Sequence, residues 1–228
     1  MKTINKNKNE RVVGIAVFSA LAFVVALVCN VIPPVAGFLS LDVKDAIITV
    51  AALIYGPVSA VIISFLAALI ELITFSTTGW YGFLMNFVSS AFFSLTASLI
   101  YKKWHTLNGA LSACFSAVIV TTGAMLLMNV FVTPLYLQYI GVPAEAAQGT
   151  VADMLPTVLL PFNFAKTLLN SAVVMLIYKP VITALRRVKV GRDGDTAVSF
   201  NRQTLAVLIV GACALVVAVT ILLIISLA

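Results

Sequence analysis

Apolar segments of bilayer length, with few charged residues, recur along almost the whole of this 228-residue chain. Hydrophobic residues make up 62% of the sequence and charged residues only 10%, and the mean hydropathy is +1.13, far outside the range of soluble domains. A helix needs about 20 apolar residues to cross a hydrocarbon core of about 30 Å, and no segment shows the alternation of a strand. The sequence therefore predicts an all-α integral membrane protein.

Seven such segments are bounded by charged residues, Pro or Gly, and they cover residues 12–32, 45–55, 58–75, 80–101, 109–136, 155–185 and 203–228. The second is short for a membrane span. Pro134 and Pro161 are placed to kink or end the fifth and sixth helices. We expect a six-helix membrane domain over residues 1–187, a charged cytoplasmic linker at 188–202 and one additional transmembrane helix at 203–228.

Basic residues cluster before the first segment, between the fourth and fifth, and between the sixth and seventh. The positive-inside rule assigns these clusters to the cytoplasm, so we expect a multi-pass cell-membrane protein with its N-terminus inside and its C-terminus outside. The length of the first segment, with no clear cleavage site before Pro33, favours a retained anchor. This topology explains the net charge of +6 without a nucleic-acid partner. The predicted outer face carries one base, Lys44, and the carboxylates Asp42, Asp45, Glu145 and Asp153.

The residues that build metal, redox and nucleotide sites are missing or scattered. Cys29, Cys114 and Cys213 lie in apolar segments without C-x-x-C spacing, and His105 is the only histidine. No Gly is followed by Lys, so a phosphate-binding P-loop cannot be written. We therefore predict no metal, no cofactor, no catalytic residue and no ATPase site of the chain's own.

The sixth segment contains a polar stripe inside an apolar helix. Asn163, Lys166 and Asn170 follow i, i+3, i+7 spacing, which places them on one helical face. Two interpretations fit this stripe. Lys166 either extends to the membrane interface, or lines a cavity that opens to the outside and binds a ligand.

Further polar residues lie at a similar predicted depth in other segments, at Asn129, Asn86 and Glu71. One asparagine in a span is often only a bond between helices, but several at one depth favour a shared cavity. Aromatic residues fall near the same face and would suit the walls of a site for a flat ring: Phe38, Trp80, Tyr81, Phe131, Tyr136 and Phe162.

Four stretches carry a family resemblance: FLSLDVKDAIITVAALIYGP (38–57), ITFSTTGWYGFLMN (73–86), MNVFVTPLY (128–136) and LPFNFAKTLLN (160–170). Over residues 11–187 the chain resembles the riboflavin-specific substrate-binding components of energy-coupling factor (ECF) vitamin transporters. The resemblance implies six membrane helices and a pocket near the outer surface, covered by the loop between the first two helices. It also implies a partner module of one membrane scaffold subunit and two ATPases, which drives uptake.

By this resemblance, Asn163, Lys166 and Asn129 contact the ligand, and residues 38–42 form part of the lid. The full set of expected ligand-binding residues is Asn163, Lys166, Asn129, Asn86, Glu71, Phe38, Leu41, Asp42, Thr78 and Tyr136. The seventh segment departs from the six-helix pattern, because the family core does not require it.

Riboflavin suits these residues, because its ring is flat and its pyrimidine edge and ribityl chain carry hydrogen-bonding groups. Thiamin or biotin remains an alternative, with Glu71 for a cation or Lys166 for a carboxylate. A polytopic membrane enzyme is a second alternative, although no catalytic cluster is present.

In the first segment, Ala16 and Ala20 form a small-x-x-x-small pair, as do Ala22 and Ala26. We expect Ala16 and Ala20 to contact the scaffold subunit, with packing inside the chain as the alternative.

Overall fold

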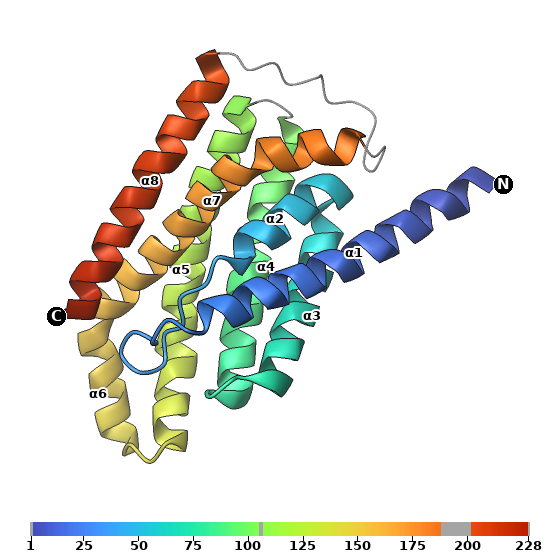
Figure 1. Ribbon diagram of the computed structural model, residues 1–228. Coiled ribbons are helices and arrows are strands. Elements are labelled where there is room, and N and C mark those ends of the chain that lie inside the picture. Colours follow the sequence, from blue (N-terminus) through green and yellow to red (C-terminus); the bar gives the residue numbers. More distant parts are fainter. Residues whose placement is uncertain (1, 105–106, 188–201, 228) are drawn as a thin grey trace.

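The computed structural model describes residues 2–104, 107–187 and 202–227, and this part of the chain is almost entirely helical (Figure 1). A short π-helical turn, Leu155–Leu159, joins α6 to α7. No strand occurs among these residues, so the predicted all-α class is confirmed. The helices are α1 Lys2–Cys29, α2 Lys44–Tyr55, α3 Pro57–Thr74, α4 Gly79–Lys103, α5 Leu107–Tyr139, α6 Ala144–Met154, α7 Leu160–Arg187 and α8 Arg202–Leu227.

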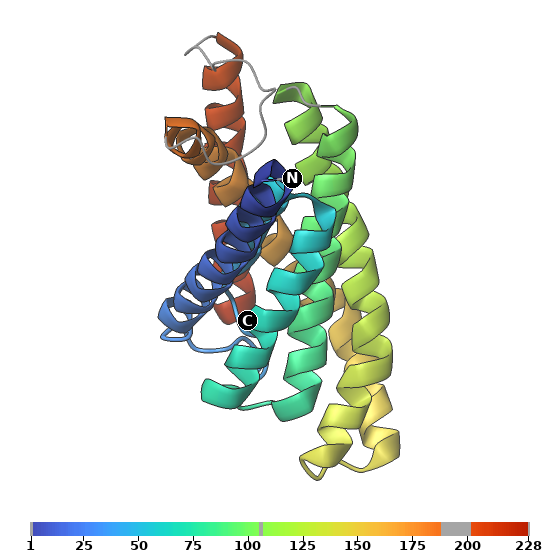
Figure 2. The same cartoon turned by 90° about the vertical axis from the view of Figure 1, so that its right-hand side faces the viewer.

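Six stretches of helix are long and apolar enough to cross a membrane, and they lie in α1, α3, α4, α5, α6–α7 and α8. Figure 2 shows α3, α4 and α5 running roughly side by side while α1 crosses obliquely. Helix α1 packs against α2 and α3, and α4 packs against α3 and α5. The hairpin of α5 and α6 extends beyond the other helices at one end of the molecule (Figure 1).

Helix α2 is the exception to the predicted series of spans. Its 12 residues extend about 18 Å at 1.5 Å per residue, which is too short for a hydrocarbon core of about 30 Å. It packs instead against α1, α3, α4 and α7, and most of its side chains are buried. The sharp turn to α3 uses Gly56 at a φ of 95°, which favours glycine, followed by Pro57 in the first turn of α3.

The predicted breaks at proline differ from the structure. Pro134 lies inside α5, which continues to Tyr139. Pro161 lies in the first turn of α7, where a missing N–H costs little. The chain also forms a helix that we did not predict, α6, and through the π turn it continues into α7.

Helix α8 lies along α7 (Figure 1), and Gly211 permits their close approach. A Cβ added at Gly211 would lie 3.2 Å from the Cβ of Met175 and 3.4 Å from the carbonyl oxygen of Ala172. The predicted linker at 188–202 falls, except for Arg202, outside the described residues. The additional C-terminal helix itself is present as α8.

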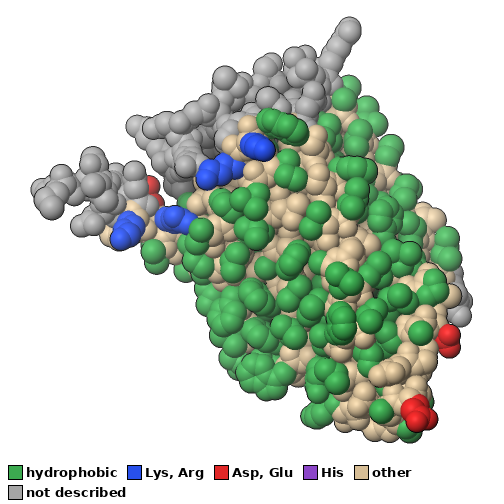
Figure 3. Space-filling model, turned by 180° about the vertical axis from the view of Figure 1, so that it is seen from behind, with side chains coloured by type: hydrophobic (Ala, Val, Ile, Leu, Met, Phe, Trp, Pro, Cys, Tyr) green, Lys and Arg blue, Asp and Glu red, His purple; other side chains and the backbone are tan. Residues whose placement is uncertain are grey.

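Charged side chains are distributed unevenly over the surface. On the face shown in Figure 3, the Lys and Arg side chains lie near one end of the molecule, and the acidic side chains lie mainly at the opposite end. Glu145 and Asp153 are exposed, whereas Asp42, Lys44 and Asp45 are buried inside the bundle. The cytoplasmic position of the N-terminus and the outer position of the C-terminus stay predictions.

Candidate functional site

A cavity of about 650 Å³, counting its space open to solvent, lies between α4, α5, α7 and the loop that precedes α2. Its lining includes seven of the ten residues predicted to bind the ligand: Phe38, Thr78, Asn86, Asn129, Tyr136, Asn163 and Lys166. Leu41, Asp42 and Glu71 do not line it, and the last two lie directly behind lining residues.

The loop over residues 30–43 closes one side of the cavity. Val35 and Leu39 exchange two backbone hydrogen bonds of 3.0 Å, and Ala36 and Gly37 make the tight turn between them with φ of 52° and 81°. Leu39 and Phe38 pack in the same hydrophobic cluster as Phe162 of α7. The loop therefore has a defined conformation over the pocket, as the predicted lid requires.

Aromatic rings form part of the pocket wall. Tyr136 lies 5.9 Å from Phe38 and 6.0 Å from Tyr81, measured between ring centroids, and Phe162 is a fourth lining ring. The other two aromatic candidates point outward, with Trp80 70% exposed and Phe131 69% exposed. Four of the six aromatic candidates thus face the cavity.

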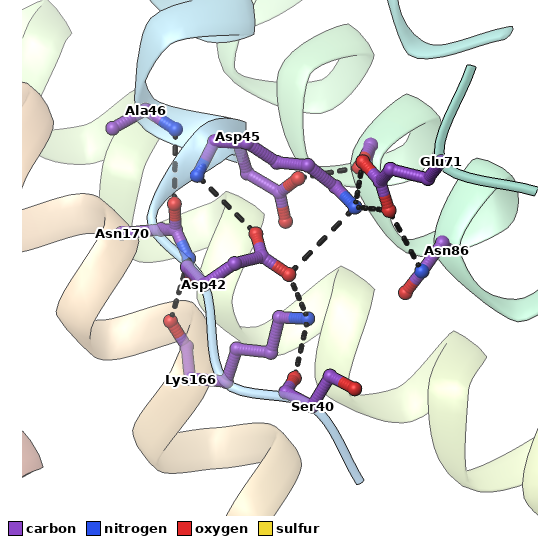
Figure 4. Close-up of polar contacts among 10 residues, drawn as sticks. Ser40, Asp42, Asp45, Ala46, Glu71, Asn86, Lys166 and Asn170 are labelled. Atoms are coloured by element: carbon purple, nitrogen blue, oxygen red, sulfur yellow. Dashed lines mark hydrogen bonds and ion pairs between the residues drawn. The ribbon is translucent and has the colours of Figure 1, made fainter. Parts of the chain in front are cut away.

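The structure excludes the first interpretation of Lys166, an extension to the membrane interface. Its side chain is not extended to an interface, because the residue is only 6% exposed and lines the cavity. The ammonium donates hydrogen bonds to Asp42 Oδ2 at 2.8 Å and to the carbonyl oxygen of Ser40 at 3.1 Å (Figure 4). One side chain of α7 thus binds the lid loop and faces the pocket.

Asn170, the third residue of the stripe, has a different role. Its Oδ1 accepts the backbone N–H of Ala46 at 2.9 Å, and its Nδ2 donates to the carbonyl oxygens of Asp42 at 3.0 Å and Lys166 at 3.1 Å. It gives this N–H in the first turn of α2 a second acceptor, beside the carbonyl oxygen of Val43 at 3.2 Å. Asn170 therefore joins α7 to the start of α2 and does not line the pocket.

Lys44 is the buried charge that sequence reasoning misplaced. It is 1% exposed, and its ammonium donates to Glu71 Oε1 at 2.7 Å and Oε2 at 2.6 Å. The ammonium also lies 3.7 Å from Asp42 Oδ2. The short second apolar segment was the available signal for this burial, because a helix too short to span the membrane starts inside the bundle.

The buried network contains three carboxylates and two ammonium groups. Burial raises the pKa of Asp42, but the ammonium groups of Lys166 and Lys44 outweigh this effect and lower the pKa to about 2. Asp42 is therefore ionised at physiological pH. Asp45 forms no ion pair among the described residues, and its Oδ1 accepts a hydrogen bond from the hydroxyl of Ser90.

Two pocket asparagines use their amide nitrogens within their own helices. Asn129 Nδ2 donates to the carbonyl oxygen of Met125 at 2.7 Å, and Asn163 Nδ2 donates to that of Leu159 at 2.7 Å. The hydroxyl of Thr133 donates to Asn129 Oδ1 at 2.9 Å. Because a carbonyl oxygen can only accept, these contacts fix which way each amide is turned.

The described residues contain no group of three metal-ligating side chains. The arrangement can instead hold a neutral, flat molecule by aromatic walls, amide oxygens and one ammonium. Whether each lining residue touches a ligand stays a prediction.

Comparisons with known proteins agree with this geometry. The family model for the ECF transporter substrate-specific component matches residues 10–178. The chain is 30% identical over 188 residues to the riboflavin transporter RibU of Staphylococcus aureus (strain TCH60), covering 82% of this chain and 98% of that protein. It is 25% identical over 174 residues to the riboflavin transporter FmnP of Bacillus subtilis (strain 168), covering 75% and 91%.

A solved structure of the S component of a bacterial ECF transporter superposes with a TM-score of 0.65 at 28% identity, covering 79% of this chain and 99% of that one. Helix α8 begins at Arg202, beyond the last residue that the family model matches. The family match, the relatives and the fold all concern the helices that surround the pocket. The chain belongs to the family of ECF transporter substrate-specific components.

Proposed function

We propose that this chain captures riboflavin from outside the cell and delivers it to a separate ATP-driven module for uptake. The observation that carries the proposal is the pocket itself, where aromatic rings, amide oxygens and the Lys166 ammonium surround a cavity of about 650 Å³. A flavin ring matches aromatic walls, and its pyrimidine edge and ribityl hydroxyls match the polar groups.

Other vitamins fit this pocket less well. A thiamin cation would need an available anion or an aromatic cage, but Glu71 already binds Lys44 and does not line the cavity. A biotin carboxylate would need a cation whose charge is not already balanced, and the charge of Lys166 is balanced by Asp42. The family is one of transporter components, so a polytopic membrane enzyme is no longer an alternative.

The proposed partners are one membrane scaffold subunit and two ATPases, in the cell membrane. Ala16 and Ala20 on α1 are exposed, whereas Ala22 and Ala26 are 0% and 4% exposed. The first pair is therefore available for a partner helix, and the second pair packs inside the chain. We propose that the surface of α1 around Ala16 and Ala20 contacts the scaffold subunit.

Flavin fluorescence tests the proposed substrate. When riboflavin is titrated with the detergent-purified chain, its fluorescence should fall until binding is saturated, because stacking on aromatic rings quenches flavin emission. An excess of thiamin or biotin should not reverse the quenching. Saturable binding of thiamin or biotin without any flavin quenching at micromolar protein would overturn the riboflavin assignment.

A further inference from the structure

The wall of the pocket formed by α4 carries an amide whose orientation is set by a charge. Asn86 Nδ2 donates to Glu71 Oε2 at 3.0 Å, and a carboxylate only accepts, so the nitrogen must face Glu71. The carbonyl oxygen of Asn86 then points away from Glu71 (Figure 4). Asn86 lines the cavity, and no described residue donates a hydrogen bond to this oxygen. The α4 wall therefore offers a fixed acceptor.

Glu71 is itself held in place. Both of its carboxylate oxygens accept from the Lys44 ammonium, at 2.7 and 2.6 Å, and the two residues are 3% and 1% exposed. A two-point contact between buried charges leaves the carboxylate little freedom to rotate. Neither residue lines the cavity. Any effect of Lys44 or Glu71 on a ligand must therefore pass through the side chains that they position.

The α7 wall offers the opposite kind of group. The Lys166 ammonium has three N–H bonds, and the described residues accept two of them, at Ser40 and Asp42. The third is available to an acceptor in the pocket. The cavity thus places a donor on α7 and an oriented acceptor on α4 around the same space.

We propose that the Lys44–Glu71 ion pair is a positioning device for Asn86, and that Asn86 selects a ligand with a ring N–H donor. This inference rests on the proposed function, because it concerns how a flavin is recognised. The oxidised isoalloxazine ring has one N–H, at N3, between two carbonyl groups. Asn86 accepts from this N–H, and the Lys166 ammonium suits a neighbouring ring carbonyl.

The test compares riboflavin with N3-methylriboflavin, in which a methyl group replaces this donor hydrogen; the Asn86 variant shows how much of any difference depends on Asn86. We expect the purified wild-type chain to bind the methylated flavin roughly 5- to 150-fold more weakly, as for the loss of one buried hydrogen bond. In Asn86→Leu, riboflavin should bind more weakly and the ratio of the two dissociation constants should fall close to one. Equal binding of both flavins by the wild type would overturn the assignment of Asn86.

The positioning role is tested by removing the ion pair as a unit. Lys44→Met/Glu71→Leu removes one charge of each sign, so the net charge of the network is unchanged, and Asp42 keeps Lys166 at 2.8 Å. If the pair positions Asn86, the ratio between the two flavins should fall toward that of Asn86→Leu. A merely structural role would weaken the binding of both flavins equally and leave the wild-type ratio, which would overturn the positioning claim.

Two further variants keep this experiment decisive. If the double variant does not fold, Glu71→Gln tests the same role. The amide of Gln offers both a donor and an acceptor, so it no longer fixes the orientation of the Asn86 amide. Ser64→Ala is the matched control, since Ser64 is buried in α3, does not line the cavity and has no hydrogen-bond partner among the described residues. Its ratio should equal that of the wild type.

Failure of this inference differs from failure of the proposed function. A wild-type chain that binds riboflavin tightly without distinguishing the methylated flavin overturns the role of Asn86 and leaves riboflavin as the substrate. A wild-type chain that binds neither flavin overturns the proposed function itself, and with it the inference.

Discussion

Lys166 joins three parts of the site through one ammonium group, because it contacts the lid loop, pairs with Asp42 and lines the pocket. A buried lysine in this position is held by its partners and is not free to follow the ligand. Its removal therefore affects both the ligand and the loop above it.

Lys166→Met should lower riboflavin affinity by roughly 10- to 150-fold, the usual effect of losing a charge-assisted hydrogen bond. The variant retains the length of the side chain, so the loss reports on the ammonium. Isothermal titration of the purified chain measures the effect. Phe164→Leu, an exposed position on the same helix, is the control and should bind as the wild type does. Unchanged affinity in a folded Lys166→Met preparation would remove this lysine from the site.

Asn170 should matter for stability. Asn170→Ala leaves the carbonyl of Asp42 without its donor, at about 1–3 kcal/mol for a buried group, and leaves the N–H of Ala46 only its bond to the carbonyl of Val43. We expect a clearly lower Tm in detergent than for the adjacent variant Ser171→Ala, which loses one bond to the carbonyl of Cys114. Equal Tm values for the two variants would contradict the role of Asn170 as the link between α7 and α2.

At the scale of elements, we expect the exposed face of α1, with Ala20, and its buried face, with Ala22, to have different roles. Ala20→Leu adds bulk to an exposed position, so the isolated chain should bind riboflavin as before while uptake by cells decreases. Ala22→Leu adds the same bulk at a position that is 0% exposed, and overpacking should destabilise the chain by about 1–3 kcal/mol. Binding titrations and cellular uptake, measured for both variants, separate the two faces. Loss of binding in Ala20→Leu would show that this alanine packs within the chain.

Helix α8 supports the bundle without lining the pocket, since no residue of α8 borders the cavity. Gly211→Leu would force α8 away from Met175 and Ala172, whereas Ala212→Leu adds the same side chain at an exposed position. We expect a lower Tm for the first variant only, with riboflavin affinity retained by both folded proteins. A large loss of affinity in Gly211→Leu would show that α8 shapes the site.

At the scale of the whole molecule, hydropathy was enough to predict the class and most of the helices. Segment length and charge determine a membrane span almost independently of tertiary contacts. Helix α6 was missed because its sequence, AEAAQGTVADM, is polar and resembles a loop. It is stabilised by packing against α5 and by continuing into α7, which no local pattern records.

Periodicity placed Asn163, Lys166 and Asn170 on one face of α7, and the structure agrees that all three are buried there. Periodicity could not show which of them line a cavity, because this depends on the loop and on α2. Glu71 has the depth of a ligand contact but pairs with Lys44, and only the tertiary structure reveals that partner. The depth of a residue was therefore predictable, and its partner was not.

The loop over residues 30–43 has one further consequence, because it is irregular backbone within a helical membrane protein. Lipid offers no hydrogen bonds to free peptide groups, so such backbone is tolerated only inside protein or against water. The carbonyl of Ser40 now accepts from Lys166, and that of Asp42 accepts from Asn170. Any movement that breaks these contacts must expose the carbonyls to water. We therefore expect this loop to open only toward an aqueous phase, where water can hydrate its carbonyls as it moves.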